Sequence, residues 1–312
     1  MHHVVKRLRY SHPANALRWA LNFRGQRATI GRRYVFDALS RVTPSVAVDT
    51  DGLRLYLSTC DREVSRETFA RGAYERALFS RVMDELRQVG LPWGGLGGRG
   101  FLDVGANIGS ATCLALSRYD AGEAWAFEPA SENVTLLRQN VLANGFEHRV
   151  HIHTVALSDH DGTVAFELSN KSCGDHRVRV ERASNEGPPA LLGETQRRTV
   201  EVHARRLDSL VDESAIDLGS LGLAWIDVQG HEGHVFEGAA ELLTSGVPIV
   251  CEYWPYGLER AGGLERFHAL VAGSRSEFID LATPGAIRPT ARLSALRARY
   301  PQLASTDLLL LR

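Results

Sequence analysis

The part of this sequence best suited to chemistry is a short apolar run that contains an acid and leads into a glycine turn. The run, residues 101–104, contains Asp103, and Gly105 and Gly109 bound the turn that follows. A strand that enters such a turn and continues as a helix presents backbone N–H groups and one carboxylate to a small ligand. A second acid, Glu128, follows 25 residues after Asp103. This is close to the spacing of about 20 residues at which the next parallel strand delivers a carboxylate to a ribose.

The composition of the turn favours S-adenosylmethionine over a nicotinamide dinucleotide, which stays as the alternative. A dinucleotide turn reads G-x-G-x-x-G because the pyrophosphate approaches the backbone closely. Here Asn107 stands between the two glycines, and the turn contains no third glycine, Lys or Arg. The methionine tail of S-adenosylmethionine carries a carboxylate for the helix-start N–H groups and an ammonium for Asp103, while Glu128 would take two ribose hydroxyls. A turn without a ligand is disfavoured, because a buried Asp103 would need another partner.

Length and composition indicate one large domain, or one domain with an appendage, that needs no disulfide or metal staple. The four cysteines are scattered, and no Cys/His group has the spacing of zinc ligands, so we expect reduced thiols, a cytoplasmic protein and no metal site. No apolar run approaches membrane-spanning length, and no signal-peptide core is present near the start. The net charge of −1 argues against a whole-surface nucleic-acid binder.

The first 41 residues differ from the rest in charge. They contain nine Lys or Arg residues and a single acid, Asp37. The favoured interpretation is a solvated basic arm. A contact for anionic lipid, nucleic acid or an acidic glycan is the alternative.

The region before the glycine turn has its own pattern. Alternation around Asp51-Gly52 predicts a β-hairpin over residues 46–57. Helical spacing predicts a helix over 66–89 that Gly72 bends. Residues 91–100 are rich in Gly and Pro and predict a linker. We therefore expect an N-terminal accessory region over residues 1–95 and a ligand-binding domain over residues 96–312.

Strands and helices alternate after the linker, which predicts a largely parallel sheet covered on both faces. The expected strands cover 101–104, 124–127, 151–155, 223–228, 248–251, 277–281 and 307–311, and the expected helices cover 110–118, with Ser110 as N-cap, 132–143 and 235–243. An excursion over residues 162–206 separates the third and fourth strands. Its segments 163–168 and 199–205 could pair as a ribbon, and a loop of that length is expected to lie over the site at the carboxyl end of the sheet.

Five segments in a fixed order resemble the FkbM-type methyltransferases. They are Asp103–Gly109, Phe127–Pro129, Ala156–Asp159, Arg206–Leu210 and Ile226–Glu232. The resemblance covers about residues 100–255, with a weaker likeness over 46–90. It implies an α/β class I methyltransferase fold, Rossmann-like and doubly wound, with a seven-stranded sheet whose last strand is antiparallel. It also implies S-adenosylmethionine as donor and, usually, O-methylation of a hydroxyl on a sugar, glycan or natural product.

The resemblance also implies roles for individual residues. The methionine part would be held by Asp103, Gly105, Ala106, Asn107 and Gly109. The ribose would be held by Glu128, and the adenine would be edged by Ser158 and Asp159. Asp227 would stand at the end of the fourth strand beside the reacting centre. The position before Ile226-Asp227 is often Lys in the family and is Trp225 here.

An enzyme that transfers a methyl group must align the acceptor with the donor and remove the proton of the acceptor hydroxyl. The candidates for the base are Asp227, His231 and His176. The unperturbed pKa of His231 is about 6.5, and this residue follows the fourth strand; the alternative is a helix-start histidine without chemistry. His176 lies in the excursion, where a solvated polar loop is the alternative, and Asp227 could instead position the donor or the acceptor hydroxyl.

The expected partner is a small-molecule or glycan acceptor, without nucleic acid. Two other functions remain open for the same fold. One is methylation of RNA or of protein nitrogen, which the basic first residues suggest. The other is a module that binds S-adenosylmethionine without catalysis.

Overall fold

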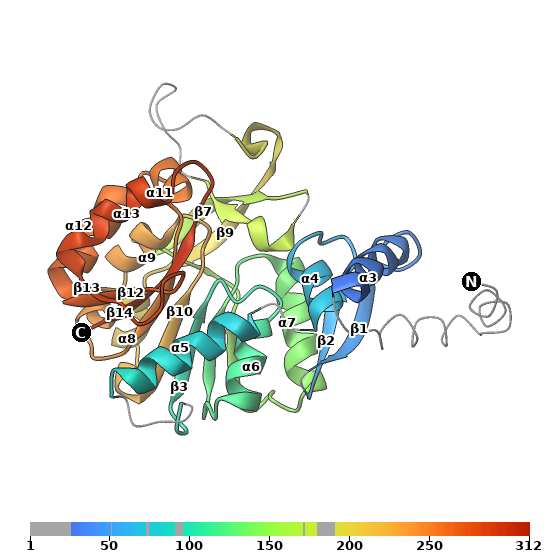
Figure 1. Ribbon diagram of the computed structural model, residues 1–312, viewed down its shortest axis with the longest axis horizontal. Helices are drawn as coiled ribbons and strands as arrows, with labels where there is room; N and C mark the ends of the chain where they lie inside the picture. The colour runs from blue at the N-terminus through green and yellow to red at the C-terminus, as the bar shows by residue number, and fades with distance from the viewer. Residues whose placement is uncertain (1–25, 51, 73–74, 91–95, 171, 180–190) are drawn as a thin grey trace, which may run out of the picture.

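The computed structural model describes residues 26–50, 52–72, 75–90, 96–170, 172–179 and 191–312. Figure 1 shows a central sheet with helices on both sides and a hairpin with its helices beside it. Most of the predicted basic arm, the tip of the hairpin at Asp51 and residues 91–95 of the predicted linker lie outside the described residues.

The main sheet has eight strands in the order β13-β12-β14-β11-β10-β3-β4-β5. Their bounds are β3 (Gly100–Val104), β4 (Ala124–Phe127), β5 (Val150–His153), β10 (Leu221–Ile226), β11 (Ile249–Tyr253), β12 (Glu277–Asp280), β13 (Ile287–Pro289) and β14 (Thr306–Leu311). Strands β5, β4, β3, β10 and β11 are parallel, and β14 is antiparallel to both of its neighbours, as expected. The prediction of seven strands is wrong by one, because β13 adds an edge strand to β12. A strand of three residues is too short to show an alternating pattern.

Helices cover both faces of this sheet, with α5, α6 and α7 on one side and α8, α9 and α12 on the other (Figure 1). Their bounds are α5 (Arg76–Gln88), α6 (Ser110–Arg118), α7 (Ser131–Ala143), α8 (Leu207–Asp212), α9 (Glu232–Glu237), α10 (Ala240–Thr244), α11 (Pro255–Arg260), α12 (Leu264–Ser274) and α13 (Leu296–Arg299). The N-cap of α6 is Gly109, with a φ of 80°, and not the predicted Ser110. The helix predicted over 235–243 is two helices, α9 and α10, because Ala239 between them has a φ of −134° and a ψ of 42°, which is not a helical conformation.

The N-terminal region consists of α3 (Gln26–Leu39), β1 (Ser45–Thr50), β2 (Leu53–Ser58) and α4 (Val64–Arg71), followed by α5. The predicted hairpin is confirmed, since β1 and β2 pair antiparallel. The prediction of a single helix over 66–89 is wrong. Gly72 has a φ of 89° and ends α4, because a left-handed residue after the last turn stops a helix.

This region shares a hydrophobic core with the sheet. Phe79 of α5 is fully buried, and its ring centroid lies 5.1 Å from that of Trp225 and 4.5 Å from that of Tyr119. Trp225 therefore packs in the core on β10. The division of the chain at residue 95 stays a prediction, although the core continues across it.

The excursion forms a second sheet in the order β6-β9-β7-β8. Its strands are β6 (Ala156–Leu157), β7 (Gly162–Leu168), β8 (Arg177–Val178) and β9 (Arg198–Arg205), with the single turn η1 (Cys173–Asp175) before β8. The predicted ribbon is confirmed, because β7 pairs antiparallel with β9 over the whole length of β7. Each helix of the described residues is too short or too polar to cross a membrane.

Asp280 should make a pH-dependent contribution to the free energy of unfolding. This fully buried carboxylate accepts hydrogen bonds from Tyr300 Oη at 2.8 and 2.9 Å and from Thr306 Oγ1 at 2.8 Å. Burial raises the pKa of Asp280, but these hydrogen bonds, a further one from the Ala282 N–H and the charge of Arg299 together bring the pKa below its ordinary value. Asp280→Asn should therefore lower the free energy of unfolding at neutral pH by about 2–4 kcal/mol.

The loss should shrink in acid. A lowered native pKa contributes stability that is present above the unfolded pKa of about 3.9 and is lost as the pH falls through the native value. Urea unfolding of both proteins across that range measures the difference. A loss that stays constant over the whole pH range would contradict this explanation.

Candidate active site

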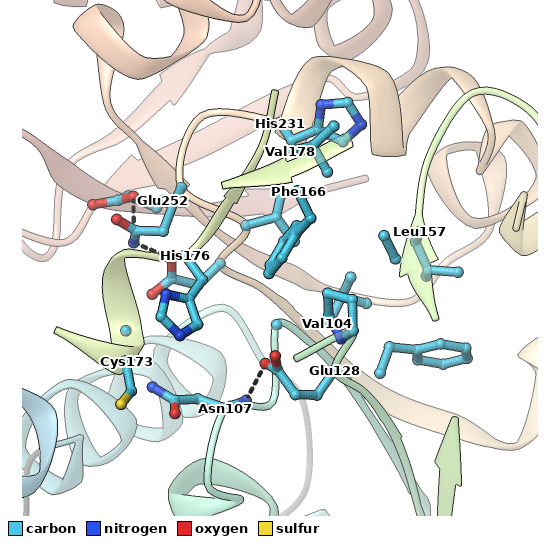
Figure 2. Close-up of a pocket in the computed structure, with 18 of the residues that line it drawn as sticks. Val104, Asn107, Glu128, Leu157, Phe166, Cys173, His176, Val178, His231 and Glu252 are labelled. Carbon is cyan, nitrogen blue, oxygen red and sulfur yellow. Dashed lines mark hydrogen bonds between the residues drawn. The ribbon is translucent and has the colours of Figure 1, made fainter. Parts of the chain in front are cut away.

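A cavity of about 260 Å³ lies where β3, β4 and β10 end. Further walls come from residues 155–157, from Glu252 of β11, from the starts of α4 and α5, and from the excursion, which contributes Phe166, His176 and Val178. Figure 2 shows Glu252 and Leu157 on opposite sides of this cavity. The carboxyl ends of parallel strands are the usual place for ligands in open α/β sheets.

Two residues of the glycine turn after β3, Gly105 and Asn107, form one wall of the cavity. Gly105 has a φ of 87°, and an added Cβ would lie 1.9 Å from the carbonyl oxygen of Asp227. Asn107 has a φ of 51°, a left-handed conformation that Asn tolerates better than most residues. Ala106 and Gly109 do not line the cavity; Ala106 is buried in the core, and Gly109 allows Leu137 of α7 to pack against the turn.

Asp103 lies away from the cavity wall. Its carboxylate is buried and accepts a hydrogen bond from the hydroxyl of Thr112 in α6. Burial raises the pKa of Asp103 to about 7. The partner that a buried acid requires is thus supplied by the protein, and Asp103 fastens α6 to β3.

Glu128 lines the cavity at the end of β4 and links the glycine turn to the loop that follows β4. Its Oε2 atom accepts the backbone N–H of Asn107 at 2.9 Å (Figure 2). Its Oε1 atom accepts the backbone N–H of Ala130 at 2.8 Å. The amide of Asn133 donates to Oε1 at 3.3 Å. Burial raises the pKa of Glu128 to about 7. Oε2 accepts fewer bonds than Oε1 and keeps a lone pair for a ligand hydroxyl.

Ser158 and Asp159 form a polar network with His231 behind the cavity. Ser158 Oγ donates to Asp159 at 3.2 Å and lies 3.0 Å from His231 Nε2. A hydroxyl has one proton, so His231 must donate from Nε2, and its Nδ1 is left as an acceptor. Of these three residues, His231 alone lines the cavity. Asp159 also forms an ion pair with Arg266 at 3.0 Å, and its carboxylate lies 2.9 Å from His234 Nδ1.

The two candidate histidines are poorly suited to removing a proton. Burial lowers the pKa of His231 to about 3, so its charged form is strongly disfavoured. His176 lines the cavity, and its Nδ1 accepts the backbone N–H of Ser169 at 2.9 Å. The neutral ring of His176 therefore carries its proton on Nε2, and this nitrogen is a donor. Burial also lowers the pKa of His176.

Carboxylates gather at the end of the cavity near β10 and β11. Gln229 Nε2 donates to Asp227 Oδ1 at 2.7 Å and to Glu252 Oε2 at 3.3 Å (Figure 2). Gln229 has a φ of 55°, an uncommon value for a residue other than Gly that holds its amide between the two acids. The Asp227 side chain is exposed at the cavity, and desolvation by the protein atoms around it raises its pKa. Burial and repulsion by Asp227 raise the pKa of Glu252.

The fold also brings carboxylates together that are far apart in the sequence. Asp227, Glu232 and Glu252 offer oxygens within 4.8 Å of one another, an arrangement that could hold a metal ion. The prediction of no metal site rested on sequence spacing, which cannot detect such a group. Glu232 Oε1 already accepts the backbone N–H groups of Val228 at 3.0 Å and Gly230 at 3.3 Å.

Sequence reasoning assigned no role to Gln229, Glu252 or Glu75, although all three line the cavity. Glu252 is an acid near the end of a buried strand, the same feature that identified Asp103, so its position was detectable. Gln229 becomes notable only through its backbone conformation. Glu75 lies before the glycine turn, in a region whose contact with the site depends on the fold.

The family profile described as the methyltransferase FkbM domain matches residues 103–268, which is more than half of the 312 residues. The chain belongs to the FkbM methyltransferase family. It is 33% identical over 156 residues to the 2-O-methyltransferase NoeI of Sinorhizobium fredii (strain NBRC 101917 / NGR234). That match covers 49% of this FkbM chain and 62% of NoeI, so less than two thirds of the relative is spanned.

Solved structures similar to this FkbM chain include two methyltransferases. The methyltransferase FkbM from Methylobacillus flagellatus KT aligns with a TM-score of 0.43 at 14% identity, over 91% of this chain and 60% of that one. The O-methyltransferase from Bacillus cereus, in complex with SAH, aligns with a TM-score of 0.43 at 12% identity, over 90% of this chain and 100% of that one. At these scores the alignments carry no argument beyond the family profile.

Proposed function

We propose that this FkbM protein transfers a methyl group from S-adenosylmethionine to a hydroxyl of a sugar, glycan or other small molecule. One observation carries the proposal. A single cavity joins the glycine turn and Glu128, which suit the donor, to the Asp227–Glu252 pair, which suits a hydroxyl that must lose its proton. The 2-O-methyltransferase name of the relative NoeI supports a hydroxyl as the acceptor.

The residues present fit S-adenosylmethionine. The Oδ1 atom of Asn107 is buried without a hydrogen-bond partner among the described residues, so a polar ligand group at the turn would satisfy it. Glu128 would accept a ribose hydroxyl, and the apolar side chains of Val155, Leu157 and Phe166 would contact the purine.

S-adenosylmethionine, when bound, supplies an electrophilic methyl carbon attached to a positively charged sulfur. The chain must then orient the acceptor hydroxyl and accept its proton. We assign the proton to Asp227, because it opens onto the cavity and burial raises its pKa above the ordinary value. Gln229 holds Asp227 and Glu252 in place, and His176 Nε2 would donate a hydrogen bond to the acceptor or the donor.

Methyl-labelled S-adenosylmethionine tests the proposal directly. The full chain would be incubated with fractions of hydroxylated metabolites and glycans, and mass spectrometry would identify what gains a methyl group. Label on a hydroxyl oxygen is the expected result. Label on RNA or on protein nitrogen would show that the acceptor is not a hydroxylated small molecule or glycan. Donor binding without transfer to any fraction would overturn the assignment as an enzyme.

Methyl transfer should not depend on a divalent metal. Gln229 already occupies the space between Asp227 and Glu252, and Glu232 is bound to two backbone N–H groups. Activity after treatment with EDTA should therefore equal that of the untreated protein, in assays with and without added Mg²⁺. Loss of activity that Mg²⁺ restores would show that the three carboxylates hold a cation.

A further inference from the structure

Glu75 is a cavity-lining carboxylate that has no role in the proposal so far. It precedes α5 as its N-cap and lies outside the residues matched by the family profile. Its Oε2 atom is buried and has no hydrogen-bond partner among the residues that the structure describes. A buried carboxylate oxygen without a partner is costly, so its position on a cavity wall indicates that a ligand supplies the missing donor.

The charges around Glu75 indicate what that donor should be. Burial, and then repulsion by the carboxyls of Asp103, Asp227 and Asp307, raise the pKa of Glu75 well above its ordinary value. Glu75 is thus close to the strand that leads into the glycine turn and to the acid at the end of β10. A positively charged group bound here would relieve the repulsion among these carboxylates.

The other acids near the turn are already engaged. Asp103 is off the cavity wall and bound to Thr112. Glu128 is bound to the backbone N–H groups of Asn107 and Ala130, at the ribose end of the cavity. Asp227 is held by Gln229 beside the acceptor.

We propose that Glu75, and not Asp103, binds the ammonium group of the methionine tail of S-adenosylmethionine. This assignment rests on the proposed function, since it concerns the same donor. It gives the N-terminal region a direct part in cofactor binding.

Two nucleosides separate the contact with the tail from every other contact. S-adenosylhomocysteine carries the amino-acid tail, whereas 5′-methylthioadenosine has the same nucleoside and sulfur without it. In calorimetry with the full chain, Glu75→Gln should lower the affinity for S-adenosylhomocysteine by about tenfold or more, and Glu75→Ala should lower it by about 30-fold or more. The affinity for 5′-methylthioadenosine should be unchanged in both variants.

The matched control is Asp84→Asn, on the same helix, where the carboxylate is exposed and paired with Arg87. It should change neither affinity. Unchanged S-adenosylhomocysteine affinity in the Glu75 variants would overturn the assignment. An equal loss of affinity for both nucleosides would show that Glu75 has only a structural role, and this result would overturn the assignment as well. Failure of the unaltered protein to bind either nucleoside would instead overturn the proposed function itself.

Discussion

Asp227→Asn should lower kcat by about 10²–10⁴-fold, the usual contribution of a positioned base. The substitution keeps the size of the side chain and can still hydrogen-bond, but an amide cannot accept the hydroxyl proton. Affinity for S-adenosylhomocysteine should change little, because we place the ribose on Glu128 and the tail ammonium on Glu75. Initial rates and calorimetry on the same preparation measure the two quantities.

The pH profile gives an independent readout of the same residue. Burial raises the pKa of Asp227, and a base is active only when deprotonated, so kcat should fall as the pH drops through a value above the ordinary Asp pKa of about 3.9. Asp227→Asn should remove this limb. Glu252→Gln should lower kcat by a smaller factor, since it leaves the proton acceptor in place. If Asp227→Asn keeps kcat within about threefold of the unaltered protein, the loss is well short of that expected for a base. His176 or His231 would then be the candidate for the base.

Gly105→Ala should abolish donor binding and destabilise the fold. The new Cβ would lie 1.9 Å from the Asp227 carbonyl oxygen, a backbone atom that cannot move without shifting β10. The left-handed φ of 87° adds a further cost. We expect a loss of at least about 2 kcal/mol in the free energy of unfolding, together with a turn displaced from the cavity.

Gly145→Ala is the matched control for this substitution. Gly145 has a φ of 71°, so it carries the same kind of backbone penalty, but an added Cβ would have no neighbour within 4 Å. Thermal unfolding should show a loss of about 1 kcal/mol, with nucleoside affinity unchanged. Equal behaviour of the two variants would show that close approach at Gly105 is unimportant.

Much of the fold follows from local patterns. The helix over residues 110–118 and the hairpin around residue 52 were predicted because periodicity and turn residues specify them within a short window. The glycine turn and Glu128 were predicted for the same reason, since β3 and β4 are consecutive strands. Gly72 was predicted only to bend a helix, because sequence spacing does not reveal that its φ of 89° ends the helix.

The roles of single acids were harder to predict, because they depend on contacts across long stretches of sequence. Asp103 has the sequence position of a ligand-binding acid, but its carboxylate accepts a hydrogen bond from Thr112, only nine residues along the chain, and it does not line the cavity. Asp159 contacts His234 and forms an ion pair with Arg266, residues that are 75 and 107 positions away in the sequence. No local pattern specifies which of several buried acids faces a cavity.

The aromatic stack of Phe79, Trp225 and Tyr119 has a practical consequence for expressing this protein. A fragment cut at the limits of the family profile would lack α5, and it would leave the rings of Tyr119 and Trp225 exposed to water. Such a fragment should aggregate, because large apolar side chains would cover one side of its sheet. Any shortened version intended for crystallisation must therefore begin before Arg76.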